Sequence, residues 1–342
     1  MVLFPVLALL VCFVILKGAD MESVWNAMKS AKPQWLAAGL ILAAVFNIAE
    51  AINLRSVLNS FGYQVSFRQG MKYAYTGYFF SSITPSATGG QPMQLYYMQK
   101  EGHKVSDSSV VLMTVAVVYK LVLALMGVAI LLFYRTQLMG YLGNYIYLYY
   151  LGLFLNTALV VILLFVMISP RCFKSLVLGG EAVLKKLHIL KKSGKRKEKL
   201  IEMADQYHEA VVFLIGHKNK IAFVLILTFI QRCSVFFMTW LIYKGMGLTG
   251  ESVLSIMILQ ASVYIAVDML PLPGAQGITE IMYKASFGQV FKGALLPASM
   301  CLTRGLNFYF LLIVSAVTAI YCHFSVRRKG LKGSWRSEEA KS

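Results

Sequence analysis

The sequence predicts an all-α polytopic membrane protein with about six full spans plus two opposed re-entrant broken-helix elements in an inverted repeat. Three observations support this fold class. Of the 342 residues, 58% are hydrophobic, whereas soluble domains have about 45–50% apolar residues. Apolar stretches of membrane-spanning length recur along the chain. Two further apolar stretches are interrupted by prolines and glycines.

The uninterrupted apolar stretches predict the spans. The first is short against the ~20 residues that a span usually needs, and it lacks the basic start of a signal peptide. We place the spans at residues 2–17, 34–58, 108–134, 145–168, 221–243 and 293–324. The chain then divides into a first membrane repeat (1–134), a fourth span (135–168), a basic linker (169–220), the remainder of the second repeat (221–325) and a basic tail (326–342).

The first interrupted stretch covers residues 70–98 and contains two prolines, a Gly-Gly pair and five hydroxyl residues between Ser81 and Pro92. A continuous helix does not tolerate this composition. Irregular backbone at membrane depth persists only where protein or a water-filled cavity satisfies its polar groups. The second interrupted stretch, residues 252–289, contains a similar run from Leu270 to Glu280. Two such breaks are typical of a transport site built on an internal repeat.

The net charge of +18 comes from 33 basic and 15 acidic residues, and the basic excess lies between the apolar stretches. By the positive-inside rule, residues 171–220, the tail and the N-terminus are expected in the cytoplasm. The first break then enters from the cytoplasm and the second from outside. Residues 171–220 are interpreted either as amphipathic helices or as a solvated linker, and the tail from Arg327 is expected to be disordered.

The sequence predicts neither a cofactor nor a metal. Its five cysteines and five histidines are scattered, without the spacing of a metal site. It also lacks a Walker motif, so direct use of ATP is not expected.

Charged residues inside spans are rare and costly, so each one indicates a functional site. Lys120 and Arg304 each follow a break by about 30 residues, and two cations facing a cavity would suit a phosphate. The alternative is that Lys120 pairs with Glu50, and Arg304 with Asp268 or Glu280, as structural ion pairs. Arg55 is expected to extend to the membrane interface.

The candidate substrate-binding residues come from the two breaks and from the polar positions within spans. Gly89-Gly90 and Gly274 are expected to adopt conformations barred to other residues, and Pro85 and Pro271 to end the incoming half-helices. The complete set is Glu50, Asn53, Thr84, Pro85, Ser86, Thr88, Gly89, Gly90, Gln91, Lys120, Arg232, Pro273, Gly274, Gly277, Glu280, Arg304 and Asn307.

The motifs from Asn47 to Arg55, from Gly77 to Pro92 and from Pro271 to Glu280 resemble the flippase-like membrane domain of the lysylphosphatidylglycerol synthase family, which includes the multiple peptide resistance factor. The resemblance runs from about residue 35 to 325. It implies a protein of the bacterial cytoplasmic membrane that belongs to the stand-alone form. In full-length members, the membrane domain translocates aminoacylated phosphatidylglycerol, and a separate domain transfers lysine from lysyl-tRNA. Ala275 stands where family members often have a second glycine.

The leading hypothesis is therefore a lipid translocase for an anionic or aminoacylated phospholipid such as lysylphosphatidylglycerol, or for a related phosphate-bearing lipid. The alternative is a phosphatidylglycerol lysyltransferase or its membrane subunit, acting in lipid modification and cationic-peptide resistance; a third is a scaffold. Because the longest non-membrane segment, 169–220, is smaller than a typical domain, catalysis by this chain is not expected. The expected partners are a membrane phospholipid, a separate aminoacyltransferase and a second copy in a homodimer, without direct nucleic-acid binding.

Overall fold

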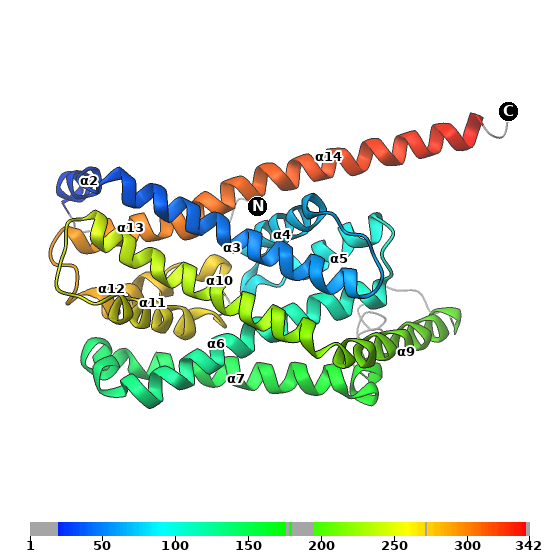
Figure 1. Cartoon of the computed structure of the whole chain (residues 1–342), viewed down its shortest axis with the longest axis horizontal. Coiled ribbons are helices and arrows are strands. Elements are labelled where there is room, and N and C mark those ends of the chain that lie inside the picture. Colours follow the sequence, from blue (N-terminus) through cyan, green and yellow to red (C-terminus); the bar gives the residue numbers. More distant parts are fainter. Residues whose placement is uncertain (1–19, 176–177, 180–193, 271, 340–342) are drawn as a thin grey trace.

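The spans form a bundle of long helices along one axis of the molecule (Figure 1). The computed structural model describes residues 20–175, 178–179, 194–270 and 272–339, and this part of the chain is helical without strands. Within it, four helical stretches are long and apolar enough to cross a membrane: Pro33–Ser60, Val105–Ile168, Lys218–Gly245 and Leu295–Phe324. The predicted span at 2–17 lies outside the described residues.

These stretches correspond to the predicted spans. They comprise α3 (Pro33–Ser60), α6 (Val105–Leu142), α7 (Ile146–Ile168), α10 (Lys218–Gly245) and the run from α13 (Leu295–Arg304) into α14 (Phe310–Glu339). Helices α6 and α7 follow each other in the chain and pack side by side in opposite directions. The short helix α2 (Met21–Lys29) precedes α3. Because α14 continues to Glu339, the expected disorder of the tail is wrong for residues 327–339, and residues 340–342 lie outside the described residues.

Both predicted breaks are present, and they enter from opposite ends of the bundle (Figure 1). The first element consists of α4 (Phe67–Ile83), the 3-10 turn η1 (Pro85–Ala87) and α5 (Gly90–Lys100), at the end of the molecule that carries α9 (Gly194–Gly216). The second consists of α11 (Val253–Val267), η3 (Pro273–Ala275) and α12 (Ile278–Phe287), at the opposite end. The two turns, η1 and η3, contact each other.

The two breaks have closely similar backbones. An extended residue precedes each 3-10 turn, Thr84 in the first element and Leu272 in the second. Each turn has the pattern Pro-x-Ala, and its alanine has a positive φ, 56° at Ala87 and 49° at Ala275. In the described part of the chain, no other non-glycine residue has a positive φ. Pro273 is therefore the equivalent of Pro85. Pro271, which was expected to end the incoming half-helix, lies outside the described residues, and α11 already ends at Val267.

Glycines in the first element serve close packing between α4 and α5. Gly89 has φ −79° and ψ −18°, in the right-handed region. A Cβ atom on Gly90 would lie 2.0 Å from Ser81 Oγ and 2.7 Å from the Gly77 carbonyl oxygen. The expectation of unusual backbone at Gly89-Gly90 is therefore wrong. It holds at Gly274, where φ is 58°, although the open side of this glycine faces the Phe308 ring.

The contacts between elements support the predicted inverted repeat. Helix α3 packs along α10, and these are the helices that precede the first and the second broken element. Helix α4 of the first element packs on α14, while α11 of the second element packs on α6. The first element thus contacts the long helix that follows the second element, and the second element contacts the long helix that follows the first. Both entering helices also begin with a serine N-cap, Ser66 for α4 and Ser252 for α11.

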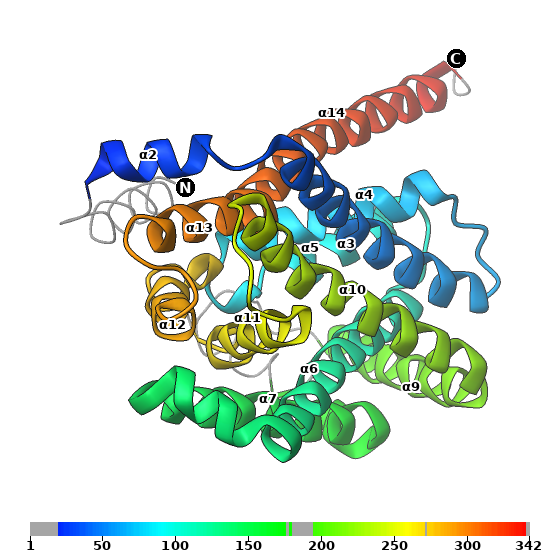
Figure 2. The ribbon, with the colours of Figure 1, turned by 60° about the vertical axis from the view of Figure 1, so that its left-hand side comes forward.

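Helix α13 leads into α14 (Figure 2), and the turn between them, η4 (Gly305–Tyr309), is π-helical. The wider turn changes the backbone hydrogen-bonding pattern directly after Arg304. The carbonyl oxygen of Asn307, inside this turn, accepts a hydrogen bond of 3.1 Å from the hydroxyl of Tyr78 on α4. A turn in the second repeat is therefore attached to the first broken element.

Helix α9 confirms the amphipathic interpretation of part of the basic linker. Five apolar residues recur in it at helical spacing and predict one buried face: Ala204, Tyr207, Val211 and Leu214 are buried, and Leu200 is half-buried. The helix packs on α6 and α7, and Tyr207 stacks on Phe173. The alternative of a solvated linker is therefore wrong for residues 194–216.

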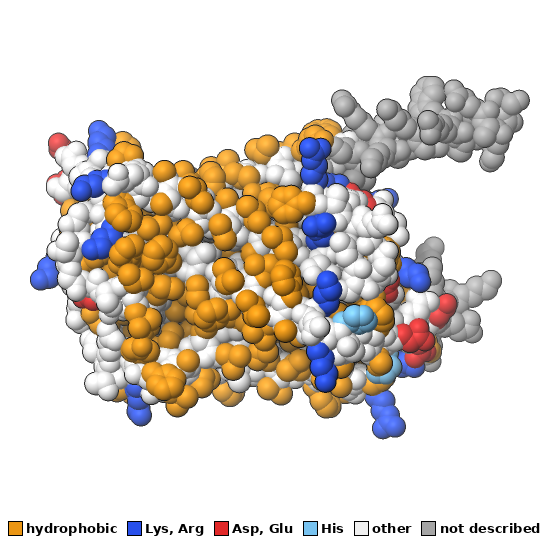
Figure 3. Space-filling view, in the orientation of Figure 1, with side chains coloured by type: hydrophobic (Ala, Val, Ile, Leu, Met, Phe, Trp, Pro, Cys, Tyr) orange, Lys and Arg blue, Asp and Glu red, His pale blue; other side chains and the backbone are white. Residues whose placement is uncertain are grey.

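The surface has the pattern of a membrane protein. In Figure 3, a broad band of hydrophobic side chains crosses the molecule, and Lys and Arg side chains gather along both of its edges. Large apolar side chains on α6 and α7 are strongly exposed, including Phe133, Tyr147 and Phe154. Exposed apolar side chains at this density are favourable in lipid and unfavourable in water.

Candidate functional site

A cavity of about 540 Å³ lies where the two breaks meet. Residues of α3, α4, α6, α10 and α11, of both breaks and of the π turn line it. Eight of the predicted site residues belong to this lining: Glu50, Thr88, Gln91, Lys120, Arg232, Gly274, Arg304 and Asn307. Charged side chains from four helices thus converge on one space between the repeats.

The other predicted site residues lie outside the lining, and several stabilise the surrounding fold. Asn53 donates to Thr228 Oγ1 at 3.1 Å and links α3 to α10. Thr84 Oγ1 accepts a hydrogen bond of 2.9 Å from the Gly89 amide. The side chain of Ser86 is not among those that the structure describes. The remaining residues outside the lining are Pro85, Gly89, Gly90, Pro273, Gly277 and Glu280.

Two ion pairs hold the second break. Lys120 on α6 pairs with Asp268, at the end of α11. Arg304 Nε lies 3.0 Å from Glu280 Oε1, and Arg304 Nη2 donates to the Gly274 carbonyl oxygen at 3.0 Å. The predicted pairing of Arg304 with Glu280 is therefore confirmed. The pairing of Lys120 with Glu50 is wrong, because Asp268 occupies that role.

Glu280 has a second structural function at the start of α12. Its Oε2 atom accepts a hydrogen bond of 2.6 Å from the Gly277 amide and so caps the helix. The same carboxylate therefore joins the break, the helix N-terminus and Arg304. A carboxylate at a helix N-terminus is stabilised by the free amide groups and the helix dipole.

Arg232 on α10 has a different environment from the other two cations. The whole residue is 1% exposed. Its guanidinium carbon lies 4.3 Å from the centroid of the Tyr119 ring and 4.7 Å from that of the Phe46 ring. Nη1 donates to the Tyr119 hydroxyl at 3.0 Å, while Nε and Nη2 have no hydrogen-bond partner. Buried polar groups are normally satisfied, so this unpaired edge needs a ligand or water.

Glu50 on α3 lines the same cavity, and its carboxylate accepts few hydrogen bonds. Gln231 donates to its Oε2 atom at 3.3 Å. Asn47, one turn earlier on α3, is buried with both amide atoms unpaired. Unsatisfied hydrogen-bonding groups therefore gather on the α3 and α10 side of the cavity.

Sequence reasoning missed Tyr119 and Phe46 and left Asp268 out of the candidate site. The Tyr119 hydroxyl donates to Asp268 Oδ1 at 3.1 Å and accepts from Arg232. A continuous chain of contacts thus runs from Arg232 through Tyr119 and Asp268 to Lys120. The position of Tyr119 directly before Lys120 was the available signal, but an aromatic residue in a membrane span is usually a packing residue.

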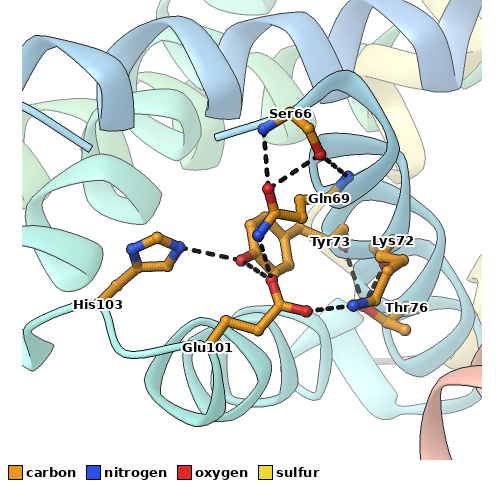
Figure 4. A network of polar contacts seen from close by, with 7 residues as sticks. All are labelled: Ser66, Gln69, Lys72, Tyr73, Thr76, Glu101 and His103. Atoms are coloured by element: carbon orange, nitrogen blue, oxygen red, sulfur yellow. Dashed lines mark hydrogen bonds and ion pairs between the residues drawn. The ribbon is translucent and has the colours of Figure 1, made fainter. Parts of the chain in front are cut away.

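A second polar cluster, outside the cavity lining, ties the outer ends of α4 and α5 together (Figure 4). Lys72 pairs with Glu101, and the Tyr73 hydroxyl contacts both Glu101 and His103. Burial acts to raise the pKa of Glu101, but hydrogen bonds from Lys72 and Tyr73 outweigh it and hold this pKa below its usual value. Burial also lowers the pKa of His103.

Within the described residues, no group of three or more His, Cys, Asp or Glu residues is placed to hold a metal ion. The residues that line the cavity offer hydrogen bonds and ion pairs. Cationic edges and carboxylates in a partly apolar cavity suit a charged headgroup.

Two opposed broken helices around a charged central cavity, within a bundle of long apolar helices, define an all-α polytopic membrane protein. The chain belongs to the family described as the lysylphosphatidylglycerol synthase TM region, which it matches over residues 1–315. This membership confirms the resemblance found in the sequence motifs.

Two relatives share the name UPF0104 membrane protein. The chain is 27% identical over 100 residues to the relative from Archaeoglobus fulgidus, a match that covers 29% of this chain and 30% of that protein. It is 30% identical over 90 residues to the relative from Methanothermobacter thermautotrophicus, covering 26% of each protein. The chain thus spans less than a third of the length of either relative.

Proposed function

We propose that this protein is a lipid translocase that moves an anionic or aminoacylated phospholipid, or a related phosphate-bearing lipid, between the two leaflets of a membrane. One observation carries the proposal: two broken helices enter from opposite ends and meet at a charged cavity in the middle of the bundle. This arrangement is characteristic of alternating-access carriers. The family description supports a lipid as the substrate.

The composition of the cavity lining suits a lipid rather than a small ion. Charged and amide side chains occupy part of the lining, whereas Leu112, Val115, Leu159 and Leu163 provide an apolar part. A phospholipid needs both kinds of surface, since its headgroup is polar and its acyl chains are not. The headgroup would occupy the cavity while the chains stay in contact with the bilayer.

Orientation and location complete the proposal. The end of the molecule that carries α9 faces the cytoplasm, in agreement with the positive-inside rule. The protein works in the bacterial cytoplasmic membrane. Its partners are the transported phospholipid, a separate aminoacyltransferase that supplies it, and a second copy of the chain.

Leaflet exchange in proteoliposomes tests this function. Purified protein is reconstituted with fluorescently labelled phospholipids, and a membrane-impermeant reductant quenches the label in the outer leaflet. A translocase makes the inner-leaflet label accessible, so quenching proceeds beyond the level of protein-free vesicles. The matched control is Glu251→Gln, a residue outside the cavity lining, and this variant should exchange lipid as the wild type does. Quenching that stops at the same level in wild-type and protein-free vesicles, for every phospholipid tried, would exclude the function.

A further inference from the structure

The cavity contains one cation and one anion that remain without an ion-pair partner. Lys120 is paired with Asp268 and Arg304 with Glu280. In the described part of the chain, no carboxylate lies within 4.0 Å of the Arg232 guanidinium, and no cation lies within 4.0 Å of Glu50. Both side chains line the same cavity.

The free edge of Arg232 has the geometry of an oxyanion site. Its unpaired atoms, Nε and Nη2, lie on one side of the planar guanidinium, and each is almost completely buried, so neighbouring side chains have to move for a ligand to reach them. Two parallel N–H groups on such an edge match two oxygens of a phosphate. The rings of Tyr119 and Phe46 lie against the guanidinium, so they restrict its orientation. The charge of Glu50 acts on Arg232 from beyond 4.0 Å, and a bound phosphate would give the buried guanidinium a closer counter-ion.

Glu50 lies close to Arg232 in the fold. It is on α3, which packs along α10, and its hydrogen-bond donor Gln231 is the residue directly before Arg232. One hydrogen bond of 3.3 Å leaves most of the acceptor capacity of this carboxylate unused. An ammonium group, with three N–H donors and a positive charge, is the complementary ligand.

We propose that the cavity selects a headgroup that carries both a phosphate and an ammonium group, a proposal that rests on the translocase function above. The phosphate binds Nε and Nη2 of Arg232, and the ammonium binds Glu50. A phospholipid of the ethanolamine type satisfies both charges at once. An anionic phospholipid of the glycerol type would satisfy Arg232 but would leave Glu50 unpaired, with a second negative charge nearby.

Competitive lipid binding tests this selectivity. Purified protein in detergent is mixed with equal amounts of phosphatidylethanolamine and phosphatidylglycerol of identical chains, and bound lipid is quantified by native mass spectrometry. We expect the wild type to bind the ethanolamine lipid about tenfold more tightly, which corresponds to about 1.4 kcal/mol. Glu50→Gln should abolish this preference by weakening the ethanolamine lipid alone. Arg232→Gln should weaken both lipids.

A matched control is Glu251→Gln, because Glu251 accepts a hydrogen bond from Tyr141 and is absent from the cavity lining. This variant should keep the wild-type preference. A test without any variant replaces the ethanolamine lipid by its N-acylated form, whose nitrogen is uncharged. The wild type should bind this form about tenfold more weakly, so the proposal remains testable if Glu50→Gln does not fold.

Several outcomes would overturn the proposal. These are equal binding of the ethanolamine and glycerol lipids by the wild type, equal weakening of both by Glu50→Gln, or no effect of N-acylation. Displacement of the lipid by an equal concentration of soluble glycerophosphoethanolamine would assign the site to a soluble ligand instead. Leaflet exchange without headgroup preference would refute the selectivity and leave the translocase in place. Selective binding without exchange would refute the translocase and keep the headgroup site.

Discussion

The two broken helices share one backbone design, but their ion pairs lie at different places. In the first element the ion pair is at the outer end, and in the second element the ion pairs are at the break. In the first element, the polar cluster of Lys72, Tyr73 and Glu101 ties the outer ends of α4 and α5, while hydroxyl groups hold the break. In the second element, the ion pairs of Lys120 and Arg304 hold the break itself. The Pro-x-Ala turn therefore defines the shape of each break, and the charged partners determine how firmly it is held.

This difference predicts which break moves during the proposed lipid transport. The first break can change shape without separating an ion pair, because its contacts are hydrogen bonds such as Thr84 Oγ1 to the Phe80 carbonyl at 2.6 Å. The second break would have to separate Asp268 or Glu280 from a partner in a long helix. We expect the first break to be the mobile gate and the second to be the fixed wall of the cavity.

The largest expected effect is that of Arg304→Gln. The change leaves the Glu280 carboxylate without its cation, and breaking a buried pair in this way costs about 3–5 kcal/mol of unfolding free energy. Chemical denaturation in detergent micelles measures this loss. The double variant with Glu280→Gln should recover part of it, since the uncompensated charge is gone. Unchanged stability of the single variant would contradict the assignment of the second break as the fixed one.

Pro85→Ala should have a larger effect on transport than Pro273→Ala. Alanine favours a helical conformation over proline by about 3 kcal/mol, so the first break should become partly helical. The ion pairs around Pro273 oppose the same change in the second break. Leaflet exchange measured on both variants should show a severe defect for Pro85→Ala and a mild one for Pro273→Ala. Equal defects would mean that the ion pairs do not distinguish the two breaks.

Acid should loosen the first element at its outer end. The pKa of Glu101 is below its ordinary 4.5 in the folded protein, so its contribution to stability is complete above pH 4.5 and is lost as the pH falls through the lowered value. The pKa of His103 is also lowered, from 6.5, and acts in the same direction below pH 6.5. Hydrogen bonds to a charged group are worth about 1.5–3 kcal/mol each.

The measurement is the thermal midpoint as a function of pH for the wild type, Glu101→Gln and His103→Gln. Glu101→Gln should remove the part of the pH dependence below pH 4.5, and His103→Gln the part that begins near pH 6.5. If all three profiles decline in parallel, the acid-sensitive groups lie elsewhere in the chain.

Gly90→Ala should destabilise the packing of α4 on α5 by about 1–3 kcal/mol, the usual cost of overpacking. The added methyl group would lie 2.7 Å from the Gly77 carbonyl oxygen, a backbone atom that cannot rotate away. Gly140→Ala is the matched control, because a Cβ atom there meets nothing within 4 Å. Thermal denaturation of the two variants should show a loss for Gly90→Ala alone.

The smallest expected effects come from the serine caps, and these should be equal. Ser66→Ala and Ser252→Ala each remove the side chain that accepts from the first turn of α4 or α11. Each change should cost about 1 kcal/mol. Hydrogen exchange should report the loss locally, in the first turn of the affected helix. A large difference between them would show that the two entrances are not equivalent.

Sequence reasoning identified the spans and the breaks because proline, glycine and hydroxyl residues interrupt apolar stretches in a visible way. It did not identify the correct partner of Lys120, since the choice between Glu50 and Asp268 depends on how α6 is rotated against α3 and α11. It also misread Gly90, because a glycine required for close packing and one required for a positive φ look the same in a sequence.

The surroundings of Arg232 also depend on helix packing, which the sequence does not reveal. Its position in a span indicated a site, but its free edge is defined by Tyr119 and Phe46, which are distant in the chain. Helix periodicity also did not predict the π turn at 305–309. A single extra residue in a helical turn leaves no pattern in composition, whereas its effect on the hydrogen bonds is clear once Tyr78 is seen to bond to Asn307.

That π turn has a consequence for how such a chain tolerates insertions and deletions. Each residue of an α-helix advances the side chains by about 100° around the axis, and a π turn accommodates one residue more than an α turn. Removing one residue between Gly305 and Tyr309 would therefore convert the π turn into an α turn, and Arg304 with the rest of α13 would keep its orientation relative to α14. The same deletion in a regular α-helical turn between Arg304 and α14 would rotate Arg304 by about 100° away from Glu280. The π turn is therefore the place in this run of helix where a change of length by one residue leaves the ion pair intact.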